Sequence, residues 1–189
     1  YDQRLFNSTQ GTFSQRLDEN SFIITPYGVD RKYMEPADIV RIENNWKECG
    51  KNPSRSVMLH KYIYEKHPDI NSIIIAHPPN IMAFAVTDAK FETKTIPESY
   101  IALRNISKLP FGSSFMQPKM VADSITKETP ILLVENDCII VTGDSLLHAF
   151  DRLEVAEYSA KAIIYSKGLG DIVSINDKQV TEIEKAFNM

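Results

Sequence analysis

Hydrophobic residues along the chain fall into short runs typical of buried strands and into longer stretches with helical spacing. The short runs lie at 22–25, 73–75, 131–134 and 138–141. They are short, largely β-branched, and bounded by turn-forming residues, which favours strands over buried helical turns. An alternation at 39–42 followed by Asn44 and Asn45 predicts a β-hairpin. The small residues at 11–14 are expected to form a loop.

Helical spacing predicts a helix that begins near Ser54, the candidate N-cap, and ends before Pro68. Shorter helices are expected at 80–86, 96–103 and 119–126, and the longest is capped by Ser145. A last helix starts at 176 or 177, and we expect its apolar residues 180, 183 and 187 to dock on the body. Mixed strands and helices without a linker predict one α/β domain over 1–189.

Composition narrows the class of protein. With 189 residues, of which 43% are hydrophobic and 24% charged, the chain can bury one substantial core. A net charge of −4 argues against nucleic-acid binding, and no apolar run is long enough to cross a bilayer. No signal-peptide pattern opens the chain, and Cys49 and Cys138 lack metal-type spacing and read as reduced thiols. A cytoplasmic protein with no nucleic-acid or membrane partner is therefore predicted.

His77 is the first candidate for chemistry, because it follows the apolar run 73–75 and precedes two prolines. A strand there would carry the imidazole to its C-terminal end, where open α/β sheets often place ligands. A single histidine at such a position is more often simply hydrogen-bonded. Whether His77 takes part in chemistry or is only hydrogen-bonded therefore depends on the residues beside it.

Several motifs occur together in one order along the chain. They are Gly11-Thr12-Phe13-Ser14, Ile24-Thr25-Pro26-Tyr27-Gly28, Pro53-Ser54-Arg55-Ser56, Ala76-His77-Pro78-Pro79, Ile96-Pro97-Glu98 and the stretch 133–143. In this register the chain resembles the class II aldolase/adducin family. The resemblance implies a single three-layer α/β/α domain with a central, mostly antiparallel sheet. It also implies a homo-oligomer, a tetramer, or pairing with a second aldolase-like domain. Members carry one more helix before residue 11, so we expect the N-terminal helix of the family to be missing from this chain.

The resemblance implies metal chemistry with zinc on three histidines and an acidic residue that shuttles the proton. This chain departs from that pattern. Ile75 stands at the first ligand position, His77 keeps the second, and Asp137 stands at the third. Ser56 replaces the glutamate, so the catalytic positions are Ser56, His77 and Asp137. His77 and Asp137 remain as metal ligands, and we expect no cofactor, or zinc if there is any.

Other positions correspond to the anion-binding side of the family, which holds phosphate. They are Thr12, Ser14, Thr25, Gly28, Ser54 and Arg55. A helix start with a serine cap and a neighbouring arginine is a good anion site. The alternative is that Ser54 only caps the helix and Arg55 is a solvated charge.

Three functions fit this pattern. The first is a family member with a degenerate metal site, which no longer works as an aldolase and binds a small anion or a sugar phosphate, or serves assembly. The alternative is a metal-dependent sugar-phosphate lyase or epimerase that uses His77 and Asp137 in an atypical site. The third is a structural subunit that supports an active partner. The sequence leaves open whether the protein is an enzyme.

Overall fold

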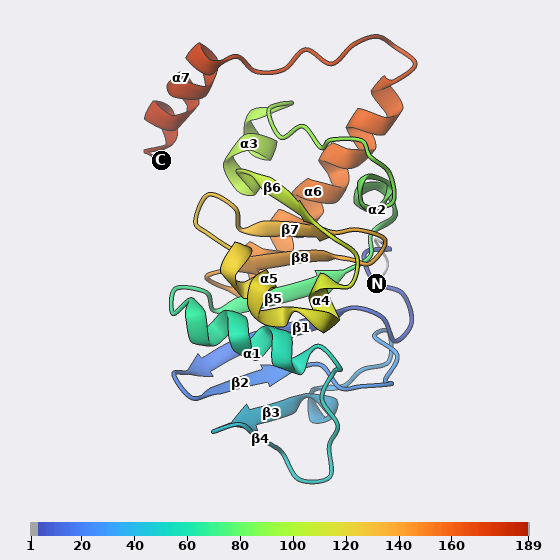
Figure 1. The fold of residues 1–189 in the computed structure, drawn as a ribbon, viewed down its shortest axis with the longest axis vertical. Coiled ribbons are helices and arrows are strands. Elements are labelled where there is room, and N and C mark those ends of the chain that lie inside the picture. The colour runs from blue at the N-terminus through green and yellow to red at the C-terminus, as the bar shows by residue number, and fades with distance from the viewer. Residues whose placement is uncertain (1–3, 189) are drawn as a thin grey trace.

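The computed structural model describes residues 4–188 as one sheet of eight strands in the order β4-β3-β2-β1-β5-β8-β7-β6, with helices on both faces (Figure 1). The strands are β1 (Thr12–Asp18), β2 (Ser21–Ile24), β3 (Val40–Glu43), β4 (Trp46–Lys47), β5 (Ser72–Ala76), β6 (Ile106–Leu109), β7 (Ile131–Val134) and β8 (Ile139–Gly143). The helices are α1 (Val57–Lys66), α2 (Pro79–Ala85), α3 (Pro97–Leu103), α4 (Ser113–Met116), α5 (Pro118–Ser124), α6 (Leu146–Ser166) and α7 (Asp177–Phe187), with a 3₁₀ turn η1 (Pro36–Asp38).

Every neighbouring pair of strands is antiparallel except β6 and β7, which are parallel. Helices α1, α4 and α5 cover one face, and α2, α3 and α6 cover the other (Figure 1). The predicted three-layer α/β/α domain with a mostly antiparallel sheet is confirmed.

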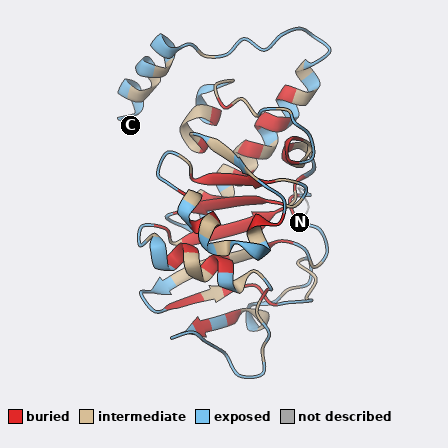
Figure 2. Cartoon of the chain, in the orientation of Figure 1, coloured by how far each residue is buried: buried red, intermediate tan, exposed pale blue. Residues whose placement is uncertain are grey.

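The sheet separates the hydrophobic core into two clusters, and strand β5 contributes side chains to both. Successive side chains of a strand point to opposite faces. Ile74 and Ala76 accordingly pack with α2 and α6, while Ile73 and Ile75 pack with α1 and α5. All four are buried, and the buried residues of the central strands stand out in Figure 2. The same alternation assigns His77, two residues after Ile75, to the face of α1.

The expected loop at 11–14 is wrong, because residues 12–18 form the long strand β1. β1 lies between β2 and β5, and Thr12 pairs with Ile75. The sequence does not show a strand pattern here, because many side chains of β1 are polar. Their hydrogen-bond partners come from other parts of the fold. Arg16, for example, donates to the carbonyls of Ile70, Tyr64 and His67.

The helix starts were predicted with mixed success. Ser145 caps α6 as expected, since its hydroxyl accepts a hydrogen bond from the backbone N–H of His148 at 3.2 Å. The N-cap prediction for Ser54 is wrong, because α1 begins at Val57 with Ser56 at its N-cap position. The hydroxyl of Ser54 is turned to other partners.

The expected docking of α7 by its apolar residues is also wrong. No residue of α7 is buried, and 60% of Phe187 is exposed. Polar contacts hold it instead: Tyr100 donates to Glu184 at 2.8 Å, and Lys94 pairs with Asp177 at 3.1 Å. Figure 1 shows α7 beyond the end of α6, after an extended segment. Among residues 4–188, no helix is long and apolar enough to cross a membrane.

Candidate active site

A cavity of about 610 Å³ opens at the end of β5 on the face of α1. Its walls come from the start of β1, the turn after β2, the segment that enters α1, helix α4 and the turn between β7 and β8. His77, Asp137, Ser56, Ser54, Arg55, Thr12 and Gly28 all line it. The structure thus brings together seven of the nine residues predicted from the sequence.

His77 and Asp137 approach this cavity from neighbouring parts of the sheet. Asp137 lies in a tight turn that Asn136 enters with a left-handed φ of 52° and that a 2.8 Å bond from the Val134 N–H to the Cys138 carbonyl closes. Ser114 of α4 donates a hydrogen bond to one carboxylate oxygen of Asp137. Burial lowers the pKa of His77, and the negative charge of Asp137 partly opposes that shift. At neutral pH the site therefore presents an uncharged imidazole close to a carboxylate.

The donors at the strand end do not complete a zinc site. Catalytic zinc takes three protein ligands and leaves one position open. Ile75 lines the cavity, and its side chain offers no donor atom. Among residues 4–188 no three His, Cys, Asp or Glu side chains are grouped closely enough to hold a metal ion. Cys138 also lines the cavity, but burial and the neighbouring Asp137 raise the pKa of its thiol, which disfavours the thiolate that a metal requires.

Three hydroxyl groups form a hydrogen-bonded cluster beside the strand end. Thr12 Oγ1 and Ser54 Oγ are 2.7 Å apart, and Ser54 Oγ and Ser56 Oγ are 3.1 Å apart. Ser56 donates to Thr12 at 3.2 Å, which closes the ring. Each hydroxyl both donates and accepts and can rotate. The ring can therefore turn its protons toward an anion in the cavity.

Two arginines add positive charge to the same cavity. Arg55 is exposed, and its guanidinium lies 5.4 Å from the ring centre of Tyr27. Arg31 is half-buried and donates to the carbonyl of Gly11 at 2.8 and 3.1 Å, and also to the carbonyls of Pro26 and Val29. Burial lowers the pKa of Arg31, although a guanidinium stays charged at neutral pH. It both ties the loop before β1 to the turn after β2 and brings a positive charge to the cavity.

Ser14 and Thr25, two of the predicted anion contacts, do not line the cavity. Ser14 is buried, and its Oγ lies 2.6 Å from His60 Nδ1 and 2.7 Å from the Tyr64 hydroxyl. Thr25 is also buried and accepts a 3.3 Å hydrogen bond from the N–H of Phe13. Both side chains hold β1 to its neighbours instead of facing a ligand.

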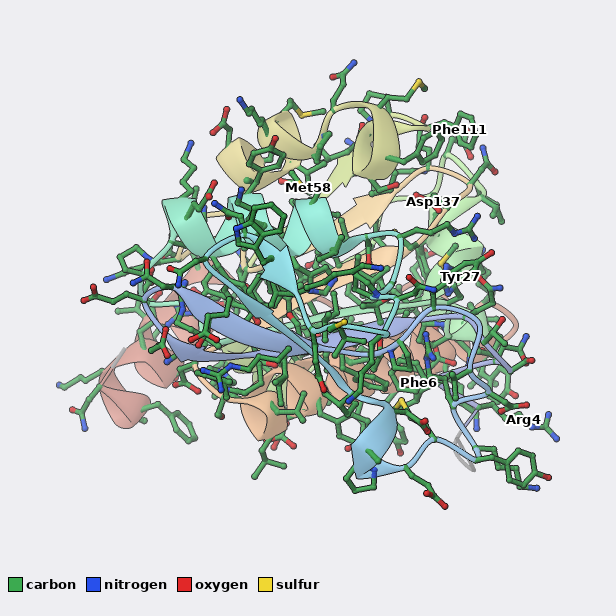
Figure 3. The ribbon with its side chains drawn as sticks, turned by 90° about the horizontal axis from the view of Figure 1, so that it is seen from below. Arg4, Phe6, Tyr27, Met58, Phe111 and Asp137 are labelled. Carbon is green, nitrogen blue, oxygen red and sulfur yellow. The ribbon has the colours of Figure 1, made fainter. Side chains whose placement is uncertain are left out.

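Several cavity residues could not be found from the sequence. Ser114 and Phe115 belong to α4, which has four residues and is too short to leave a periodic pattern. Arg31 carries no local signal, because it reaches the site by donating to the carbonyl of Gly11, a residue of another segment. In the view of Figure 3, Asp137 lies between Tyr27 and Phe111.

Comparison with known proteins agrees with this architecture. Residues 1–164 match the family described as Class II Aldolase and Adducin N-terminal domain, and the chain belongs to that family. The 3-oxo-tetronate 4-phosphate decarboxylase of Haemophilus influenzae is 26% identical over 183 residues, which cover 92% of this chain and 85% of the relative. The L-fuculose phosphate aldolase of Methanococcus vannielii is 27% identical over 161 residues, 85% of this chain and 87% of the relative.

The same fold is found in a crystal structure of YgbL from Klebsiella pneumoniae. The two superpose with a TM-score of 0.84 at 18% identity, covering 97% of this chain and 91% of the other. The resemblance to the class II aldolase family predicted from the motifs is confirmed.

Proposed function

We propose that this protein is a lyase that binds a phosphorylated sugar in the 610 Å³ cavity and breaks a carbon–carbon bond beside its carbonyl group. The observation that carries the proposal is that His77 and Asp137 face the same cavity as the Thr12, Ser54 and Ser56 hydroxyls. The names of two relatives, a decarboxylase and an aldolase of sugar phosphates, support the same class of reaction.

The phosphate would lie against the hydroxyl cluster and Arg55. Hydroxyl and guanidinium donors are a suitable set for a dianionic group, because hydrogen bonds to a charged acceptor are roughly twice as strong as neutral ones. Arg31 would add its charge from the opposite loop. Gly28, at the turn after β2, has a left-handed φ of 76° and no side chain to obstruct the mouth.

His77 would act as the base. Its neutral imidazole takes the proton of a substrate hydroxyl, the adjacent carbon–carbon bond breaks, and the electron pair passes to the carbonyl as an enolate. The imidazolium then returns its proton to the enolate carbon, which releases the second product. The Asp137 carboxylate, oriented by Ser114, stabilises the imidazolium between the two steps. Since the donor set lacks a third zinc ligand, no step is assigned to a metal.

A second candidate is a binding or assembly domain without turnover. Ile75 and Ser56 favour it, because an isoleucine offers no ligand and a serine does not titrate near neutrality. The lyase and the binding domain both predict that a phosphorylated ligand binds, whereas a domain that serves assembly alone does not. Only the lyase predicts products.

The two candidates are separated by incubating the protein with a panel of ketose phosphates, with zinc and with chelator, and measuring products. We expect His77→Ala and Asp137→Asn to lose turnover, while the control His148→Ala, on α6 away from the cavity, keeps it. Because burial lowers the pKa of His77, the acidic limb of the kcat/KM profile should fall below pH 6.5, the ordinary value for histidine. Binding without turnover under every condition would reject the lyase and favour the binding domain.

A further inference from the structure

Arg31 directs most of its hydrogen bonds to backbone carbonyls beside the cavity. Its Nε and one Nη donate to the carbonyl of Gly11 at 3.1 and 2.8 Å, and the other Nη donates to the carbonyls of Pro26 and Val29 at 3.2 and 2.7 Å. A guanidinium carries five N–H donors in a rigid, planar fork, and these bonds engage four of them. The backbone N–H of Arg31 adds a 2.9 Å bond to the carbonyl of Ser8. One residue therefore holds the loop before β1 and the turn after β2 together.

The contact with Gly11 fixes the position of Thr12. The carbonyl of Gly11 and the N–H of Thr12 belong to one planar peptide group, so a carbonyl that is held in place also places the Cα of Thr12. Gly11 has a left-handed φ of 83°, and a glycine has little conformational preference of its own to maintain it. Thr12 is buried and β-branched, so its χ1 is restricted and the direction of its hydroxyl follows its backbone. The guanidinium of Arg31 therefore determines where Oγ1 of Thr12 enters the hydroxyl cluster.

The contact with Pro26 leads to the other side of the same cluster. Pro26 forms an antiparallel bridge with Pro53, in the segment that enters α1. The N–H of Ser54, the next residue, donates to the carbonyl of Thr25 at 3.0 Å. The turn after β2 thus holds the backbone of Ser54, whose hydroxyl belongs to the cluster. Arg31 is connected in this way to both segments that supply the hydroxyl groups.

We propose that Arg31 is a positioning residue for the anion site, where its fork of donors sets the spacing between the hydroxyls of Thr12 and Ser54. The proposal rests on the proposed function, since it takes the phosphate to lie at the hydroxyl cluster. A positive charge alone would not serve this role. A lysine ammonium is a point charge on a flexible stem and does not reproduce the planar fork that binds the carbonyls of Gly11, Pro26 and Val29.

Calorimetric titration with inorganic phosphate tests the proposal on Arg31→Lys, which keeps the charge and removes the fork. A misplaced hydroxyl loses its hydrogen bond to a charged acceptor, so the affinity for phosphate should fall roughly tenfold. Arg41→Lys is the matched control, because Arg41 is exposed on β3 and does not line the cavity. This control should bind phosphate like the wild type.

A double-mutant cycle with Thr12→Val separates positioning from general destabilisation. Valine has the shape of threonine without the hydroxyl, so in this background Arg31 has no Thr12 hydroxyl to place. Most of the loss that Arg31→Lys causes in the wild type should therefore disappear, because the two residues act as a unit. A loss of the same size in both backgrounds would overturn the proposal, since Arg31 would then act through its charge or through overall stability.

Gly11→Ala perturbs the same peptide group while Arg31 stays in place. Alanine is strained at a φ of 83°, and its Cβ would lie 2.6 Å from Cδ1 of Phe6, so the loop must adjust. This variant should also weaken phosphate binding, and it decides the proposal if Arg31→Lys does not fold. Wild-type affinity in either variant would overturn the proposal and leave the proposed function standing. If the wild-type protein itself does not bind phosphate, the proposal and the proposed function both fail.

Discussion

Lowering the pH should destabilise the protein through His60, the most deeply buried ionisable group of α1. His60 is fully buried, and its Nδ1 is bonded to Ser14. Within residues 4–188, its Nε2 has no hydrogen-bond partner. Burial therefore lowers the pKa of His60 from 6.5 to about 3. An added proton would leave a positive charge without water or an opposite charge beside it.

The magnitude follows from the two pKa values. As the pH falls below 6.5 the unfolded chain binds a proton at this position, while the folded protein does not until about pH 3. Stability therefore falls with pH in this window, because the unfolded state binds more protons. With about 1.36 kcal/mol for each pH unit, the loss from His60 between pH 7 and pH 5 is about 2 kcal/mol. The loss of stability continues to grow as the pH falls to about 3.

Urea unfolding at pH 7, 6 and 5 measures this loss, with His60→Gln as the test variant. Glutamine does not titrate, so the variant should lose about 2 kcal/mol less than the wild type between pH 7 and pH 5. Any fixed cost of the substitution cancels, because only the pH dependence is compared. The contribution of His77 has the same sign, is present in both proteins, and cancels as well.

Leu147→Gln, at an exposed position on α6 that carries no titratable group, serves as the surface control and should keep the steep pH dependence of the wild type. If His60→Gln loses as much stability as the wild type between pH 7 and pH 5, His60 is not the buried neutral group described above. The reasoning from burial would then be refuted.

Two further predictions concern packing and the division of roles among the serines. Gly143→Ala should lower the free energy of unfolding by about 2 kcal/mol in urea denaturation, because a Cβ there would lie 2.6 Å from the backbone nitrogen of Ala149; an unchanged midpoint would show that α6 can shift. Ser14→Ala should cost about 1–3 kcal/mol of stability and leave phosphate affinity unchanged, whereas Ser54→Ala should weaken phosphate binding measured by calorimetry. The reverse pattern would contradict the assignment of Ser14 to the packing of β1 against α1 and of Ser54 to the ligand.

Much of the fold could be predicted because its signals are local. The apolar runs that became β5, β7 and β8 are buried on both faces, and neighbouring turn residues mark their ends. The N-cap of α6 at Ser145 needs only its own first turn. The candidate site could be located from the order of the motifs along the sequence. His77 follows one apolar run, and Asp137 precedes another.

Other features depend on residues far apart in the sequence. β1 was missed because its polar residues are satisfied by α1, some fifty positions later, as in the Ser14 to Tyr64 bond. α4 was missed because four residues show no period. The Ser114 hydrogen bond to Asp137 and the carbonyl contacts of Arg31 likewise exist only in the folded chain.

By itself the sequence determined the family, the order of most elements and the identity of the residues at the strand end, including the isoleucine that supplies no ligand. Only the tertiary structure decided which polar residues line the cavity and which hold β1 to its neighbours, and it alone brought Thr12, Ser54 and Ser56 into one hydroxyl cluster. The physical reason is that strand and helix patterns are read over a few neighbouring residues. A cavity is defined by side chains that converge from segments separated by dozens of residues, and their orientation is fixed by packing.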